Sequence, residues 1–312
     1  MKTLSFEENQ VLFGSDPTEG IVAVEPLGKD AMRLFLRSED RLEFRDESFT
    51  PFILLEEERL LHDFKKPCRF EPLSSKNEYK TLALFQSWLD CTKARTHLSK
   101  TTRIQPSSPD APYLFFSDPV HQFLLLTGKT LFKKLAFKNL HRLALDIETA
   151  TAPGYAFSNP TRKEDRILSI ALMDNHGNEE VLFATEYDER EMLEAAGEII
   201  HRYDPDVLEG HNLFNFDLEY IAARAKMHGI KLPLGRSREE PSARRSRLYV
   251  AERTIDYTRF EIFGRQVVDT LFLVQYYDVA ARERLLKDTW LTADEFILAD
   301  HHEVYFYDPA TG

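Results

Sequence analysis

Two acidic residues, Asp146 and Glu148, lie two positions apart in the stretch Leu-Ala-Leu-Asp-Ile-Glu-Thr, residues 143–149. Apolar residues occupy the alternate positions, which predicts a strand with one apolar face and with both carboxylates on the other face. Neighbouring carboxylates repel each other, and a hard divalent cation with oxygen ligands relieves that repulsion. The pair alone also fits a water-exposed sheet edge, so a metal site requires another acid from elsewhere in the chain.

Asp217 is the candidate for that further acid. The sequence predicts a short strand at residues 207–210 and a helix from Asn215, its N-cap, to Gly229, which puts Asp217 in the first helical turn. Junctions between a strand and a following helix lie at the carboxyl edge of the sheet, where the sites of α/β proteins usually form. If this strand neighbours the acidic one, three carboxylates converge, and a site for hard cations becomes the favoured interpretation.

The composition bounds the class of protein. The chain of 312 residues is long enough for two domains, and 43% hydrophobic with 29% charged residues describes an ordinary globular protein. The net charge of −12 argues against a general nucleic-acid coat. Enzymes that hold cations are an exception, because the metal neutralises part of their carboxylates.

Cysteine content and hydropathy indicate the cellular compartment in which the protein works. Two cysteines, Cys68 and Cys91, are too few for a metal cage and fit a reducing compartment, where a chance pair of thiols is favoured over a disulfide. No window approaches about 18 apolar residues, and the start of the sequence carries no apolar core of signal-peptide length. We therefore expect a cytoplasmic protein without a membrane span.

The chain up to residue 136 is predicted to be a separate, smaller α+β domain. Apolar runs between turn-forming residues predict strands at residues 21–24, 32–36, 42–44 and 49–55. Helical pieces are predicted at residues 79–98 and 120–126. None of these segments has the spacing of a catalytic motif, so we place the site in a second domain at residues 137–312.

The second domain has longer elements. Beyond the acidic strand, the sequence predicts strands at residues 167–173, 181–183, 207–210, 254–263 and 267–270. It predicts helices at residues 188–203, 215–229, 271–281 and 292–304. A hairpin followed by crossovers predicts an α/β fold in which helices flank a mixed sheet.

Five arginines occur in residues 234–250, a stretch that reads as a loop; Arg244 and Arg245 are among them. Such a basic stretch beside an acidic site suits a polyanionic substrate. A flexible, solvated insertion is an equally good interpretation.

Two motifs of the second domain resemble those of a known family. Leu145-Asp146-Ile147-Glu148-Thr149 resembles the first exonuclease motif of the family B DNA polymerases, D-I-E-T. Asn212-x-x-x-Phe216-Asp217 resembles their second motif, N-x-x-x-F-D. The similarity spans roughly residues 141–290, and the preceding part is similar to the N-terminal domain of the same polymerases. The polymerase domain with its aspartates has no counterpart in this sequence.

The resemblance implies a ribonuclease H-like fold and a 3′–5′ exonuclease that uses two Mg²⁺ or Mn²⁺ ions, about 3.5–4 Å apart. Asp146 would bridge both ions, Glu148 would bind one ion and help to orient the attacking water, and Asp217 would bind the second ion. The substrate would be DNA, preferably a single-stranded 3′ end.

The same resemblance suggests substrate contacts. Thr149 belongs to the first motif, and Asn212 and Phe216 belong to the second, where an aromatic ring can stack on an unpaired terminal base. A core position fits Phe216 equally well. Arg244 and Arg245 complete the set of predicted substrate contacts.

The third motif of the family, Y-x-x-x-D on a helix, has no match after residue 270. Phe296-Ile-Leu-Ala-Asp300 is the nearest pattern, and it would make Asp300 the fourth catalytic carboxylate and metal ligand. In the competing interpretation, which we slightly favour, Tyr307-Asp-Pro-Ala corresponds to the segment just before the third motif, and the chain stops short of it.

Two functions from different classes follow. The leading hypothesis is a metal-dependent 3′–5′ DNA exonuclease, acting alone or with a polymerase or repair partner. The alternative is a catalytically weak or truncated exonuclease fold that binds nucleic acid. The sequence does not discriminate between DNA and RNA.

Overall fold

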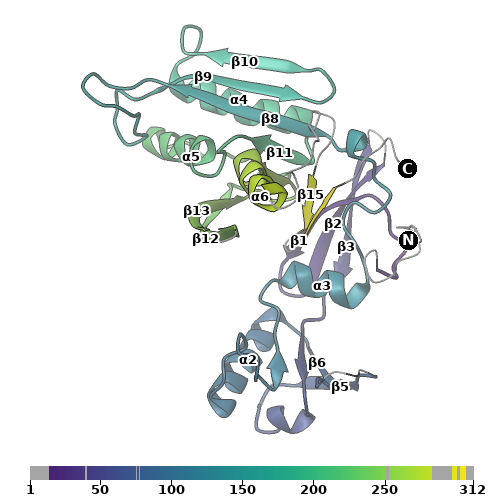
Figure 1. The fold of residues 1–312 in the computed structure, drawn as a ribbon. Helices are drawn as coiled ribbons and strands as arrows, with labels where there is room; N and C mark the ends of the chain where they lie inside the picture. Colours follow the sequence, from purple (N-terminus) through teal and green to yellow (C-terminus); the bar gives the residue numbers. More distant parts are fainter. Residues whose placement is uncertain are drawn as a thin grey trace. The chain divides into compact units, whose positions relative to one another are not determined.

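The computed structural model describes residues 14–38, 41–74, 76, 78–250, 253–282, 297–300 and 303–306 (Figure 1). The chain divides into two compact units, Met1–Leu140 and His141–Gly312. Within the described residues, no helix is both long and apolar enough to cross a membrane. The assignment of residues 1–136 to an N-terminal domain like that of the polymerases stays a prediction.

The first unit contains two antiparallel sheets. The three-stranded sheet has the order β1 (Ile21–Leu27), β2 (Ala31–Ser38) and β3 (Arg41–Ser48), and Phe123 of α3 (Pro119–Thr127) packs into its core. The four-stranded sheet has the order β5 (Cys68–Pro72), β6 (Thr81–Phe85), β4 (Phe52–Leu55) and β7 (Tyr113–Leu114). Helix α2 (Trp88–Thr102) packs on this second sheet, and two short 3-10 helices, η2 (Glu58–Leu61) and η3 (Phe137–Asn139), complete the unit.

The predicted helix at residues 79–98 is wrong in its first part. Thr81–Phe85 is a strand between two partners, and all five of its side chains are buried. The helix begins after Ser87, whose hydroxyl accepts a hydrogen bond from the main-chain N–H of Asp90. A continuous apolar run of this length fits a fully buried strand as well as a buried helix, so its periodicity could not decide between them.

The second unit is built on a five-stranded mixed sheet. Its strand order is β10 (Glu179–Phe183), β9 (Ile167–Asp174), β8 (Arg142–Thr149), β11 (Val207–Gly210) and β14 (Gln266–Asp269). The first three strands form an antiparallel meander, whereas β11 is parallel to both β8 and β14. This topology, with helices packed on the sheet, is the predicted ribonuclease H-like α/β fold.

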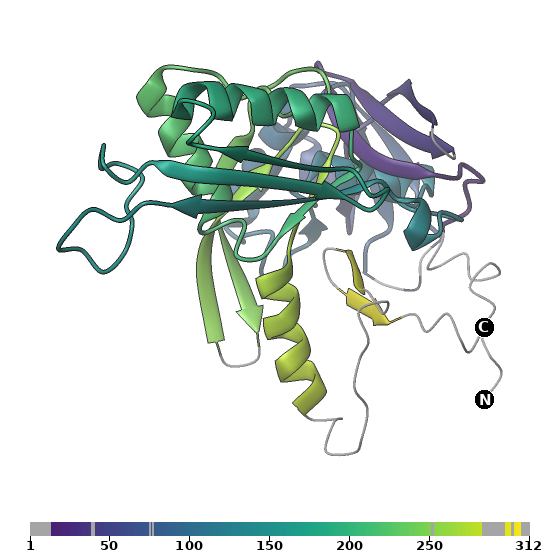
Figure 2. The same ribbon diagram turned by 90° about the horizontal axis from the view of Figure 1, so that it is seen from above.

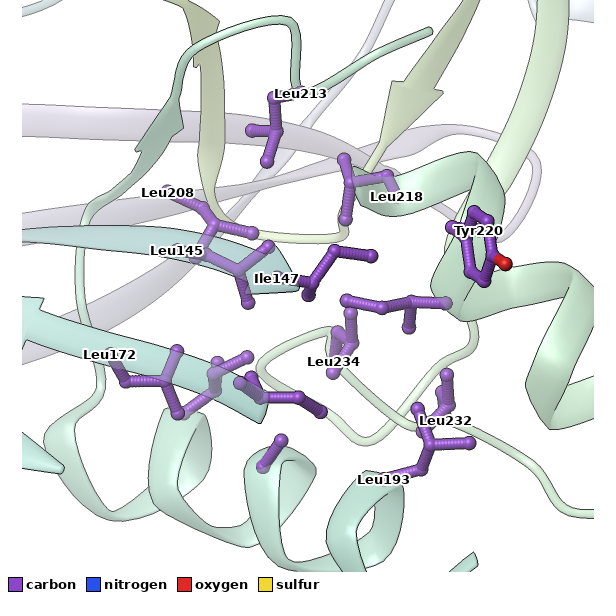
Figure 3. Close-up of a cluster of buried hydrophobic side chains, with 14 of the residues drawn as sticks. Leu145, Ile147, Leu172, Leu193, Leu208, Leu213, Leu218, Tyr220, Leu232 and Leu234 are labelled. Atoms are coloured by element: carbon purple, nitrogen blue, oxygen red, sulfur yellow. The ribbon is translucent and has the colours of Figure 1, made fainter. Parts of the chain in front are cut away.

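Two helices bury the apolar face of this sheet. Helix α4 (Glu189–Tyr203) lies over the sheet, as Figure 2 shows, and it begins with a capping box between Asp188 and Glu191. Helix α5 (Asp217–His228) ends at Gly229, whose φ of 65° is left-handed. Side chains of β8, β9, β11 and both helices interdigitate in one core (Figure 3). Labelled members of that core are Leu145, Ile147, Leu172, Leu193, Leu208 and Leu218.

Two further predictions for this unit need correction. Part of the stretch read as a loop forms β12 (Ser242–Val250), which pairs with β13 (Arg253–Glu261) along its whole length. Helix α6 (Thr270–Arg282) follows β14 as predicted. The predicted helix at 292–304 is wrong over its described residues, which form β15 (Ile297–Asp300) and an antiparallel partner, β16 (Glu303–Phe306).

Candidate functional site

The acid pair lies on the exposed face of β8. Leu143, Leu145 and Ile147 are buried, whereas Asp146 and Glu148 are exposed, as the alternation predicts. Neither carboxylate forms a hydrogen bond or an ion pair with another described side chain. A bulge between Glu148 and Thr149 shifts the pairing with β9 directly after the second acid. Two unneutralised carboxylates of one strand face are therefore open to a ligand.

Asp217 joins this pair from α5. The residue is 1% exposed, and its Oδ1 accepts a hydrogen bond of 3.1 Å from the main-chain N–H of Ile147, the residue between the two acids. Strands β8 and β11 are neighbours, which is the arrangement that brings the start of α5 to β8. The structure therefore brings Asp217 to the strand segment that carries Asp146 and Glu148.

Burial raises the pKa of Asp217 from 3.8 to about 6. The main-chain N–H groups of Ile147 and of Asp217 itself oppose the rise, and the negative charges of Asp146 and Asp269 add to it. A carboxylate that is buried beside other carboxylates is costly to ionise unless a cation lies nearby. The oxygen donors of these acids match the preference of Mg²⁺ and Mn²⁺, so the residues fit such ions.

Asp269 holds the loop that precedes α5. It ends β14 and is buried, and its oxygens accept hydrogen bonds from the main-chain N–H groups of Asn212 at 2.9 Å, Phe214 at 3.0 Å and Leu271 at 3.0 Å. Asn212 has a φ of 64°, a left-handed conformation that Asn tolerates better than most residues. These contacts give Asp269 a supporting role in the loop that leads to Asp217.

Gly210 is a supporting residue that the sequence reasoning missed. A Cβ atom at this position would lie 2.7 Å from the carbonyl oxygen of Leu145 and 3.0 Å from the Leu213 side chain. Only glycine therefore lets β11 end this close to the acidic strand. The one available signal was a glycine two residues before the second motif.

Thr149 and Phe216 lie near a cavity at the end of β8. The Thr149 hydroxyl donates to the Ser158 hydroxyl at 2.9 Å, and Ser158 to Thr161 form one wall of a cavity of about 440 Å³. Phe216, with Asn215, Glu219 and Tyr220 of the opposite wall, lines the same cavity. The Phe216 ring is half-buried against the core, 5.5 Å from the Tyr220 ring, so it both packs and faces a cavity. Phe216 is also the N-cap of α5, in place of the predicted Asn215.

The arginines of residues 234–250 differ in their surroundings. Arg236 is buried and binds Asp204 at 2.9 Å and Asp206 at 2.7 Å, so it supports the fold. Arg244 and Arg245 are exposed on β12, in a sheet separate from the one that carries the acids. Arg244 pairs with Glu261 at 2.8 Å. The sheet topology thus does not bring these two arginines together with Asp146, Glu148 and Asp217, the three residues of the acid cluster.

Asp300 is the remaining predicted ligand. It is the last residue of β15, a strand rather than the predicted helix, and its side chain falls outside the described part of the chain. Phe296 and Tyr307-Asp-Pro-Ala also lie outside the described residues. The role of Asp300 therefore stays a prediction.

This geometry defines a ribonuclease H-like domain with carboxylates gathered at one end of its central strand. Residues 126–279 match the family model of the DNA polymerase family B exonuclease domain. Residues 126–279 are therefore similar to the exonuclease domain of the family B DNA polymerases.

Relatives that match the chain are polymerases. DNA polymerase 1 of Pyrococcus abyssi is 27% identical over 241 residues, which cover 70% of this chain and 30% of that protein. DNA polymerase 2 of Aeropyrum pernix is 29% identical over 146 residues, which cover 46% and 16% of the two chains. The DNA polymerase delta catalytic subunit of Plasmodium falciparum is 29% identical over 192 residues, covering 54% and 17%. The chain therefore spans less than a third of each of these relatives.

A solved structure supports the same fold. The family B DNA polymerase from the hyperthermophilic archaeon Pyrobaculum calidifontis aligns with a TM-score of 0.57 at 19% sequence identity. The alignment covers 85% of this chain and 37% of the polymerase chain.

Proposed function

We propose that this chain is a metal-dependent 3′–5′ exonuclease that hydrolyses single-stranded DNA ends. One observation carries the proposal. The buried Asp217 carboxylate is hydrogen-bonded to the main chain of β8, and burial together with the charge of Asp146 raises its pKa to about 6. That arrangement is unfavourable for the metal-free ionised site, and a divalent cation with carboxylate ligands removes the conflict.

The ligand roles follow from positions on the strand and the helix. Of the two acids on β8, Asp146 is the one whose charge acts on Asp217, so it would be the ligand shared by the two ions. Glu148 follows on the same exposed face of β8 and binds one ion, and Asp217 binds the other. Bound Mg²⁺ or Mn²⁺ supplies an activated water and stabilises the leaving 3′ oxygen.

Substrate contacts are proposed for Thr149, Asn212 and Phe216. Thr149 and Phe216 lie beside the 440 Å³ cavity between residues 158–161 and the start of α5. Arg244 and Arg245 provide exposed positive charge on β12, which suits a phosphate backbone. The paired state of Arg244 makes Arg245 the stronger of these two candidates.

The alternative function is a nucleic-acid-binding module of weak or no activity. It is favoured by one observation, that residues 297–300, with Asp300, form a strand where the third motif predicted a helix. Asp269 has a supporting role in this site, because its oxygens accept three main-chain hydrogen bonds. Asp300 remains the proposed fourth ligand.

The free thiols of Cys68 and Cys91 support a reducing compartment, and we propose that the protein works in the cytoplasm, alone or with a polymerase or repair partner.

Digestion of a 5′-labelled single-stranded DNA oligonucleotide with Mn²⁺ tests the proposal. We expect a ladder that shortens from the 3′ end, with no ladder for Asp146→Ala. Glu186→Gln, which removes an exposed acid outside the site, is the matched control and should leave the ladder unchanged. Intact oligonucleotide, retarded in a gel by the parent and by Asp146→Ala alike, would establish the binding module instead. Loss of activity in Asp300→Ala would identify the fourth ligand, and full activity would exclude it.

A further inference from the structure

A second group of potential metal ligands lies at the other end of β8 from the acid cluster. His141 directly precedes β8, Asp174 ends β9 opposite Leu143, and His176 belongs to the turn between β9 and β10. Asp146 follows His141 by five positions, which is about 16 Å along a strand. The group is therefore separate from the carboxylates of the proposed nuclease site.

The three side chains converge closely. One ligand atom from each of His141, Asp174 and His176 lies within 4.8 Å of the other two. His141 Nε2 lies 2.9 Å from Asp174 Oδ2, and the two imidazole rings are stacked with their centres 4.3 Å apart. Among the residues that the structure describes, this is the group of histidine, cysteine and acidic side chains gathered tightly enough to hold one metal ion.

We propose that His141, Asp174 and His176 form a binding site for a divalent transition-metal ion of the zinc class. Two imidazole nitrogens and one carboxylate oxygen are a ligand set that suits Zn²⁺, Co²⁺ or Ni²⁺, whereas Mg²⁺ prefers oxygen ligands alone. Water completes the coordination from the exposed side, where His176 lies. The site thus differs in its metal preference from the all-carboxylate cluster.

Binding requires one proton and one side chain to move. The ion takes the place of the hydrogen bond between His141 Nε2 and Asp174 Oδ2, and the proton of that bond is released to solvent or moves to Nδ1, because a metal-binding imidazole nitrogen carries no proton. Both ligand atoms then lie about 2.0–2.2 Å from the metal, which their present separation of 2.9 Å nearly allows. His176 must turn out of the stack for its nitrogen to face the ion, and its exposed side chain can rotate quickly.

Asp174 is held in place for this role. Its Oδ1 accepts hydrogen bonds from the main-chain N–H groups of His176 at 3.0 Å and of Asn178 at 2.8 Å. Hydrogen bonds of this kind orient a metal-binding carboxylate, and the ion would bind Oδ2, which also accepts a hydrogen bond of 2.9 Å from Nδ2 of Asn178. The ion would tie the β9–β10 turn to the start of β8, and so would fix one end of the strand that carries Asp146.

Titration of the full-length Asp146→Ala variant with Co²⁺, in excess Mg²⁺, tests the site. Asp146→Ala weakens Co²⁺ binding to Asp146, Glu148 and Asp217, and the excess Mg²⁺ occupies any binding capacity that these acids retain. The Co²⁺ signal therefore reports on the histidine site and does not depend on nuclease activity. We expect the visible absorption of low-coordinate Co²⁺, which Zn²⁺ removes. His176→Ala, a change at an exposed position, should weaken Co²⁺ binding at least tenfold.

The matched control is His62→Ala, because His62 is an exposed histidine beside an acid, Asp63, but in another unit. It should leave Co²⁺ binding unchanged. Double substitution of the adjacent His301 and His302 by alanine should also have no effect. The proposal is overturned if the Asp146→Ala protein gives no Co²⁺ absorption. It is also overturned if adding His176→Ala to that protein leaves its affinity for Co²⁺ unchanged. The proposal is also overturned if the double substitution of His301 and His302 abolishes the Co²⁺ absorption and His176→Ala does not.

Discussion

The carboxylate of Asp217 accepts a hydrogen bond from the main-chain N–H of Ile147 at 3.1 Å, across 70 residues of sequence. Ile147 stands between Asp146 and Glu148, so this one bond joins the two sequence motifs at the main chain of β8. A carboxylate fixed in this way cannot move away from its acidic neighbours when it ionises. In the ionised, metal-free site, Asp217 and its acidic neighbours therefore repel one another, and a cation, a proton or a neutral side chain at position 217 would remove that repulsion.

Replacement of Asp217 by asparagine should stabilise the metal-free protein at neutral pH. The pKa of Asp217 in the folded protein is raised from 3.8 to about 6, so its contribution to stability is fully present below pH 4 and is lost as the pH rises through 6. Two pKa units correspond to about 3 kcal/mol. The asparagine side chain would keep an acceptor for the Ile147 N–H without that loss. Thermal unfolding in a chelator should therefore give Asp217→Asn a higher Tm than the parent at pH 7.5.

The sign of this effect can be checked by its pH dependence and by a control. The advantage of Asp217→Asn should shrink as the pH falls from about 7 to about 4, because the parent becomes neutral at this position too. Asp188→Asn is the matched control, since Asp188 is an exposed N-cap and Asn caps helices equally well. An advantage of Asp217→Asn that is the same at both pH values would rule out the electrostatic explanation.

Mn²⁺ binding should release a proton near pH 6. Cations bind the ionised carboxylate, and the metal-free site holds a proton on Asp217 up to about pH 6. Calorimetric titrations at pH 6 in two buffers of different ionisation enthalpy measure this release directly. We expect up to one proton per site in the parent and none in Asp217→Asn. Equal heats in both buffers for the parent would mean that Asp217 is already ionised before the metal arrives.

Gly210→Ala should destabilise the second unit although it adds only a methyl group. The new Cβ would lie 2.7 Å from the Leu145 carbonyl oxygen, which is backbone of β8 and cannot turn aside. Overpacking of this kind costs about 1–3 kcal/mol. Gly197→Ala is the control, because Gly197 lies in α4 with nothing within 4 Å of a new Cβ and should gain up to about 1 kcal/mol. Denaturant unfolding of the two variants should move the midpoint in opposite directions.

The elements that hold the acids follow from local signals in the sequence. Strand β8 alternates apolar and acidic residues, and α5 ends at a glycine with the left-handed φ that a C-cap uses. The contact between Asp217 and Ile147 follows once β8 and β11 are neighbours, which the order of elements already suggests. Gly210 could not be understood in this way, because its role is a distance to the main chain of another strand.

The failures have physical causes as well. Strand β12 exposes most of its side chains, so its sequence lacks the apolar alternation of a half-buried strand. What stabilises it lies on β13, where Asp256 is the cross-strand partner of Arg247 at 2.6 Å. Residues 297–300 were predicted as part of a helix over residues 292–304 from the local sequence alone. They pair instead with β16, which follows closely in the sequence, and a strand of four residues is too short to show a periodicity.

Arg224 should be the most costly single replacement around the proposed site. It is buried on α5, donates to Glu189 and to the carbonyl oxygens of Pro160, Arg162 and Lys163, and so anchors one wall of the cavity near Phe216. Arg224→Met removes the arginine partner of the buried Glu189 carboxylate and leaves it only His228 and the Ile167 N–H, at a cost of up to about 3–5 kcal/mol. Chemical denaturation measures that cost.

A double-mutant cycle separates the ion pair from simple packing. Glu189→Gln in the Arg224→Met background should cost less than the same change in the parent, because the unpaired buried charge disappears. Arg190→Met is the control: Arg190 pairs with Glu194 on the exposed side of α4, and such pairs contribute about 0.3–0.5 kcal/mol. If Arg224→Met were no more destabilising than Arg190→Met, the residue 160–163 wall would not depend on Arg224. Its hydrogen bonds to the three carbonyl oxygens would then contribute little to the shape of the cavity.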